Sequence, residues 1–88
     1  PEEVSLGQNY PNPFNPETAI RYALPKTGEV RLTVYDLLGH EVAMLVDGLQ
    51  SAGFHTVRFD GSGLPSGPYV YRLQAGNRIF TRTMILLK

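Results

Sequence analysis

The 88 residues are 42% apolar and 18% charged, which is the composition of a folded domain with one modest core. Eight basic residues balance eight acidic ones and lie scattered singly, which argues against a nucleic-acid-binding surface. The absence of cysteine excludes a disulfide framework, thiolate metal sites and cysteine nucleophiles, and every apolar run is far shorter than the ~20 residues of a transmembrane segment. We expect residues 1–88 to form a single domain.

Alternation of apolar and polar residues, interrupted by Pro and Gly, predicts strands and no helix. In chain order the expected strands are a short one near residues 5–8, then 20–24, 30–35, 42–46, 54–59, 69–75 and 80–88. Gly76-Asn77 predicts a hairpin turn before the last of them. About seven strands with turn signals roughly every 8 to 12 residues favour an all-β, immunoglobulin-like antiparallel β-sandwich, with a small barrel as the alternative.

The same alternation assigns side chains to the two faces of each strand. The loop after residue 46, bounded by Asp47-Gly48 and Ala52-Gly53, is expected to be a hairpin or a corner. The residues expected to face inward are Val30, Leu32, Val34, His55, Val57, Phe59, Tyr69, Tyr71, Leu73 and Ala75. Val42, Met44 and Val46 are expected to make a shorter strand.

One segment departs from the pattern. It comprises Asn9, Tyr10, Pro11, Asn12, Pro13, Phe14, Asn15 and Pro16, and we call it the Asn-Pro segment. Proline fixes φ and keeps the preceding residue out of the helical region, so the segment is expected to be extended and stiff. We expect Tyr10 and Phe14 to anchor it over the open end of the sandwich, with Asn side chains bonding to its free backbone groups.

Residues that could carry catalysis are few. His40 and His55 are the only imidazoles, and neither has an evident partner base or nucleophile in the sequence. Ser66 lacks the surrounding Gly residues of a nucleophile elbow, and the Asp60-Gly61-Ser62-Gly63 loop offers one carboxylate where a calcium loop offers several. We therefore predict no enzyme activity and no catalytic, cofactor-binding or metal-binding residues.

Carbohydrate binding is the main alternative function, because β-sandwiches often bind sugars. Stacking on a sugar ring requires exposed flat aromatic side chains, and the sequence has no Trp. Only Tyr35 and Phe54 alternate outward from the predicted strands.

Residues 6–20, which contain the Asn-Pro segment, resemble the opening signature of the type A C-terminal sorting domain of the bacterial type IX (Por) secretion system. Further similar residues continue to the end of the chain. They are Val34-Tyr35-Asp36, Leu38-Gly39, Ala52-Gly53, His55, Phe59-Asp60-Gly61, Leu64, Ser66-Gly67, Tyr69-Val70-Tyr71-Arg72-Leu73 and residues 81–88. The loop into the strand at Tyr69 also resembles the immunoglobulin-like domain of flagellar hook-capping proteins.

The resemblance implies a non-catalytic sorting signal at the C-terminus of an exported protein, which is often a glycoside hydrolase or another hydrolase. Such proteins cross the inner membrane by a signal peptide, and an outer-membrane translocon then recognises the folded domain. A sortase-like peptidase removes the domain in many cases, and the cargo reaches the cell surface or the medium. Because the sequence begins at Pro1 without a signal segment, we expect an upstream cargo domain in a longer precursor.

The terminal strand is the expected recognition element. Met84 and Leu86 alternate with Ile85 and Leu87, so both faces of this strand are apolar and one core layer cannot cover both. We expect the translocon to read Met84, Ile85, Leu86, Leu87 and Lys88, through side chains or by pairing at the strand edge. The structural alternative is that the second face lies under the Asn-Pro segment or within a central strand. Gly67, Tyr69 and Tyr71 complete the expected structural motif.

Overall fold

The structure is a computed structural model that describes residues 1–88. Its seven strands are β1 Ser5–Leu6, β2 Glu17–Leu24, β3 Gly28–Tyr35, β4 Glu41–Gln50, β5 Gly53–Asp60, β6 Gly67–Ala75 and β7 Arg78–Leu86. The strands lie where the alternation places them, although most extend further than predicted. No helix is long and apolar enough to cross a membrane.

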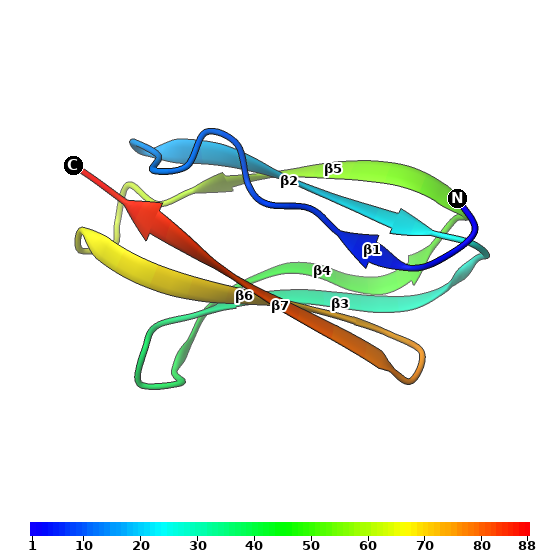
Figure 1. The fold of residues 1–88 in the computed structure, drawn as a ribbon. Coiled ribbons are helices and arrows are strands. Elements are labelled where there is room, and N and C mark those ends of the chain that lie inside the picture. The colour runs from blue at the N-terminus through cyan, green and yellow to red at the C-terminus, as the bar shows by residue number, and fades with distance from the viewer.

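The strands form two antiparallel sheets that pack face to face (Figure 1). One sheet has the order β1-β2-β5 and the other the order β4-β3-β6-β7. β2 pairs with β5 and β3 pairs with β6, as strands B with E and C with F pair in immunoglobulin domains. The predicted immunoglobulin-like sandwich is confirmed, and the small barrel is excluded.

The core lies between the sheets and is built by alternate residues of the central strands. Val30, Leu32 and Val34 of β3 are buried, as their spacing predicts. They pair with buried residues of β6, namely Ala75, Leu73 and Tyr71. Tyr69, Tyr71, Leu73 and Ala75 supply that inner face of β6. The β6–β7 hairpin turns at Gly76, whose φ of 60° is a conformation that glycine adopts without steric cost.

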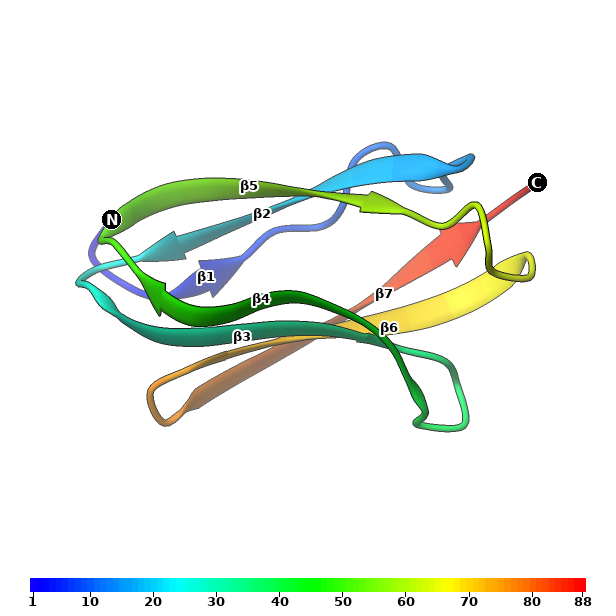
Figure 2. The same cartoon turned by 180° about the vertical axis from the view of Figure 1, so that it is seen from behind.

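β4 differs from its prediction in length. It runs through Asp47-Gly48 to Gln50, and Ser51-Ala52 then form the corner at which the chain changes sheets (Figure 2). The register with β3 shifts between Leu32, which is opposite Val46, and Thr33, which is opposite Met44. The extra residue between those partners is a β-bulge, and it turns Met44 to the outer face with 41% of its surface exposed.

Gly61, directly after β5, provides a test of how closely the end of the sandwich is packed. A Cβ atom at this position would lie 3.0 Å from Leu86 Cδ2 and 3.4 Å from Phe14 Cε2, and both of those side chains are buried. Since neither has room to move, Gly61→Ala is expected to lower the free energy of unfolding by about 1 to 3 kcal/mol. Urea denaturation of Gly61→Ala measures this.

The control is Gly63→Ala, where the new Cβ meets nothing within 4 Å. Equal unfolding midpoints for the two variants would contradict the packing described at Gly61.

Candidate recognition surface

The Asn-Pro segment lies along the gap between the two sheets, beside the end of β7 (Figure 1). Backbone hydrogen bonds hold it to β2: Tyr10 N donates to Ala19 O and Ala19 N donates to Tyr10 O, each at 2.9 Å. Just before the segment, Gly7 N donates to Arg21 O at 2.8 Å. The segment therefore continues the edge of the β1-β2-β5 sheet where β1 ends.

Phe14 attaches the segment to the other sheet. Its N–H donates to Ile85 O and its carbonyl accepts from Leu87 N–H, both at 2.9 Å. Its ring is 2% exposed and meets the ring of Phe59 edge to face, with the centroids 6.0 Å apart. The expectation that Phe14 anchors the segment is confirmed, and the anchor joins β5 and β7 as well as the segment.

The expectation for Tyr10 is wrong. Tyr10 is 81% exposed, because its backbone pairs with Ala19 and its side chain points away from the core. Pro11, Asn12 and Pro13 are exposed with it. The turn between the two attachment points thus displays its side chains to solvent.

Asn9 is the second buried anchor, and sequence reasoning did not single it out from the other asparagines. Its Nδ2 donates to Thr18 Oγ1 at 3.0 Å and to Pro11 O at 3.1 Å. Its backbone N–H donates to the hydroxyl of Tyr71 at 2.8 Å, and that hydroxyl donates to Gly7 O at 2.7 Å. The network joins residues 62 positions apart, so no local pattern could have shown it.

The buried position of the Tyr71 hydroxyl shifts its pKa. Burial raises its pKa above the ordinary value of 10.0, while the hydrogen bond from the Asn9 amide and the charge of Arg82 act in the opposite direction. The neutral phenol, which can both accept and donate a hydrogen bond, is the form that the network requires.

The terminal strand presents only part of its predicted recognition set. Met84 and Leu86 are fully buried in the core, whereas Ile85 is half-buried and Leu87 is 53% exposed. β7 is an edge strand, so the structural alternative that places it as a central strand is wrong. The Asn-Pro segment bonds to the edge of β7, and both Ile85 and Leu87 keep part of their surface exposed. Side chains available to a partner here are therefore those of Ile85, Leu87 and Lys88.

Lys88 is held against the β5–β6 loop. Its N–H donates to Ser66 Oγ at 3.0 Å, and its ammonium group donates to the carbonyl of Ser62. The same loop is bonded to β6 through Tyr69, whose hydroxyl donates to Pro65 O at 2.7 Å. The end of the chain and the Asn-Pro segment therefore lie at the same end of the sandwich (Figure 1).

The histidine and carboxylate residues weighed from the sequence engage local groups, and the charge of Lys88 also acts on Asp60. The ring of His40 contacts Asp36 at 3.0 Å in the exposed β3–β4 turn, and hydrogen bonds from that turn lower the pKa of Asp36. His55 stacks on Tyr22 and contacts Ser51 O at 2.8 Å. Asp60 accepts hydrogen bonds from the hydroxyl and N–H of Ser62, which lower its pKa.

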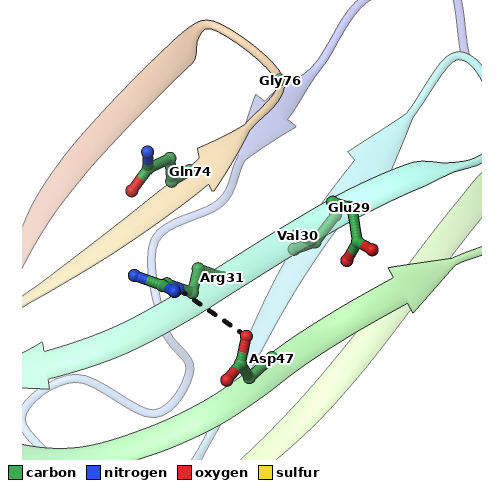
Figure 3. Close-up of a pocket in the computed structure, with 6 residues that line it drawn as sticks. All are labelled: Glu29, Val30, Arg31, Asp47, Gln74 and Gly76. Atoms are coloured by element: carbon green, nitrogen blue, oxygen red, sulfur yellow. Dashed lines mark ion pairs between the residues drawn. The ribbon is translucent and has the colours of Figure 1, made fainter.

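An open hollow on the outer face of the four-stranded sheet is lined mainly by polar and charged residues (Figure 3). It is lined by the start of β3, the end of β4, the end of β6 and the turn at Gly76. Within it, Arg31 Nε lies 3.7 Å from Asp47 Oδ1 and forms an ion pair with it. Both of these side chains are more than half exposed, so the pair contributes little to stability. No group of three or more His, Cys, Asp or Glu residues anywhere in the structure is placed to hold a metal ion.

Comparison with known proteins adds a finding that covers nearly the whole chain. The sequence model of the family described as secretion system C-terminal sorting domain matches residues 8–87. No curated protein matches the chain. The matched range begins at Gln8, whose side chain bonds to Thr83 O, and ends at Leu87, which bonds to Phe14. Both partners of the contact between the Asn-Pro segment and β7 therefore lie within the match.

The hydroxyl of Tyr71 gives the first test of this surface. Tyr71→Phe removes the acceptor of the buried Asn9 N–H and the donor to Gly7 O, so it is expected to cost about 1 to 3 kcal/mol of unfolding free energy. Tyr69→Phe is the matched control, because it removes one bond to a loop carbonyl and is expected to cost less. Chemical denaturation of both variants measures the difference; an equal or smaller loss in Tyr71→Phe would contradict the network.

A pH dependence follows from the raised pKa of Tyr71. A pKa that is higher in the folded state stabilises the fold below the unfolded-state pKa, about 10, and this stabilisation is lost as pH rises through the folded-state pKa. Burial also raises the pKa of Tyr22, so wild type and Tyr71→Phe share part of the alkaline loss. Above about pH 10 wild type is expected to lose stability more steeply than Tyr71→Phe in thermal melts. Parallel curves would show that the Tyr71 phenol does not contribute.

Proposed function

The chain belongs to the family of secretion system C-terminal sorting domains, and we propose that the outer-membrane translocon reads it at the end of the sandwich that carries Tyr10 and Leu87. The family is that of C-terminal sorting signals for type IX secretion, which direct proteins to the cell surface or the extracellular space. We define the recognition surface as the exposed side chains of residues 10–13 together with Ile85, Leu87 and Lys88.

The observation that carries this proposal is an exposed set of apolar side chains on a fixed backbone. Tyr10 is 81% exposed and Leu87 is 53% exposed, yet backbone hydrogen bonds hold both residues, to Ala19 and to Phe14 respectively. Exposed apolar groups mark interaction surfaces, and a fixed backbone lowers the entropy that binding must overcome. Lys88 adds a positive charge beside them.

The two chain ends support the same arrangement. Residue 1 lies at the opposite end of the sandwich from residue 88 (Figures 1 and 2). An upstream cargo domain would join the sandwich at that opposite end and leave the proposed recognition surface free. The cargo, a hydrolase in this proposal, would pass through the periplasm after inner-membrane export, and a sortase-like peptidase would act after the translocon.

The role proposed for the domain itself is non-catalytic binding. His40 lies in the β3–β4 turn and His55 in β5, and the two rings contact separate oxygen atoms, those of Asp36 and Ser51. A hydrolytic site needs a nucleophile and a base that converge on one position. The arrangement of these two rings favours a structural role for both.

Carbohydrate binding remains the second candidate because of Phe54. It is 81% exposed on the outer face of β5, beside the polar side chains of Arg21 and Thr56 in an open hollow. Tyr35, the other outward aromatic, is half-buried and bonded to Arg72, so it offers a sugar ring little surface. Saturable binding of soluble xylan, cellulose or mannan that is lost in Phe54→Ala would favour this function.

The recognition surface is tested by replacing Ile85 and Leu87 with Thr, which keeps strand preference and removes apolar area. A reporter fused upstream of the domain is expected to reach the cell surface at about one tenth of the wild-type level, since losing even one buried Leu contact weakens binding by that factor. Surface labelling of intact cells measures delivery.

The matched control is Leu49→Thr with Ile79→Thr, which removes two exposed apolar side chains, near the end of β4 and the start of β7, at the opposite end of the sandwich. Thermal melts of all variants separate recognition from folding. If the Ile85→Thr/Leu87→Thr variant is folded and delivers the reporter at the wild-type level, the recognition surface lies elsewhere on the domain.

A further inference from the structure

The outer edge of β7 has the backbone geometry to pair with another strand. Ile85 O and Leu87 N point away from β6 and bond to Phe14, and the β6–β7 register is unbroken from Leu86 to Arg78. The N–H and C=O groups of Ile79, Thr81 and Thr83 therefore point to the same outer side. A row of this kind is a template for strand addition unless something covers it.

Residues 8–14, which we call the strap, cover the C-terminal half of this row. Gln8 Nε2 donates to Thr83 O at 2.9 Å, and Asn12 Oδ1 accepts from Ile85 N at 2.9 Å. Phe14 occupies Ile85 O and Leu87 N through its own backbone. The strap thus supplies a hydrogen-bond partner at each outward position from Thr83 to Leu87, with side chains as well as backbone.

The opposite edge of the same sheet is protected in another way. β4 carries two register irregularities, and bulges of this kind interrupt edge pairing. Pairing of β4 with β4 of a second copy, centred on Met44, would also place Glu41 opposite Asp47. Like charges directly opposite one another destabilise a strand pair.

β7 has no register irregularity, and the middle of its sequence suits pairing with itself. An antiparallel pair of β7 strands centred on Thr83 would place Thr81 of one copy opposite Ile85 of the other, and Ile79 opposite Leu87. The side chains of Ile79 and Leu87 are 58% and 53% exposed in the single chain and would cover each other. Like charges meet only at the two ends of this register, where Arg78 lies opposite Lys88, and pairs of β-branched residues stabilise a sheet.

We infer that the strap holds the protein monomeric by occupying the β7 edge, at which two copies would otherwise pair antiparallel through β7. Release of the strap exposes Ile85 and Leu87 backbone groups and extends the free row from Ile79 to Leu87. The occupant of the released edge is a second copy of this chain.

The test is the variant Asn12→Ala/Phe14→Ala, which removes the acceptor for Ile85 N and the buried ring that anchors the strap. Sedimentation equilibrium is expected to give a dimer dissociation constant at least about tenfold lower than that of wild type. Adding Thr81→Pro removes an outward N–H that β6 does not use, and it is expected to return the variant to a monomer. Asn15→Ala, an exposed position of the same segment, serves as the control and is expected to sediment as wild type does.

Circular dichroism establishes that each variant is folded, and Asn12→Ala/Phe14→Leu, which keeps an apolar side chain in the core, replaces the first variant if that one unfolds. A folded, strap-released protein that stays monomeric would overturn the inference. A dimer that persists with Thr81→Pro would also overturn it, because the two copies would then associate elsewhere. Wild type that dimerises as strongly as the variant would show that the strap has no such effect.

Discussion

The N-terminal segment keeps its place because the ring of Phe14 is buried at the end of the sandwich where the two sheets meet. The ring packs on Phe59 and lies within contact distance of Gly61, while the Phe14 backbone bonds to Ile85 and Leu87. One residue therefore joins β5, β7 and the segment. If the ring left the core, the edge of β7 and the loop after β5 would both lose their cover.

This attachment explains how the segment can cover the core at one end of the sandwich and still expose the side chain of Tyr10 to solvent. The buried Asn9 and Phe14 fix the backbone on either side of the exposed residues 10–13, so Tyr10 is presented to solvent without a flexible loop beneath it. The family match spans both the segment and β7. A translocon that reads this end would recognise a surface that exists only in the folded domain.

The central strands could be predicted from the sequence because the apolar alternation in β3 and β6 marks the face that meets the core, although Thr33 on the other face of β3 is also buried. β4 could not, since its bulge shifts the alternation and is set by pairing with β3. Local sequence also could not distinguish Tyr10 from Phe14, because the choice depends on the bridge between Tyr10 and Ala19. The bond between Asn9 and Tyr71 joins distant residues, and only the folded chain brings them together.

Amide hydrogen exchange along β7 tests most directly whether Phe14 and its segment are an integral part of the fold. Ile85 and Leu87 N–H are bonded to Asn12 and Phe14, whereas the outward N–H of Thr81 has no such cover. If the segment is an integral part of the fold, the Ile85 and Leu87 amides are protected as strongly as amides in the sheet centre, and the Thr81 amide exchanges fast. Exchange at Ile85 and Leu87 as fast as at Thr81 would contradict it.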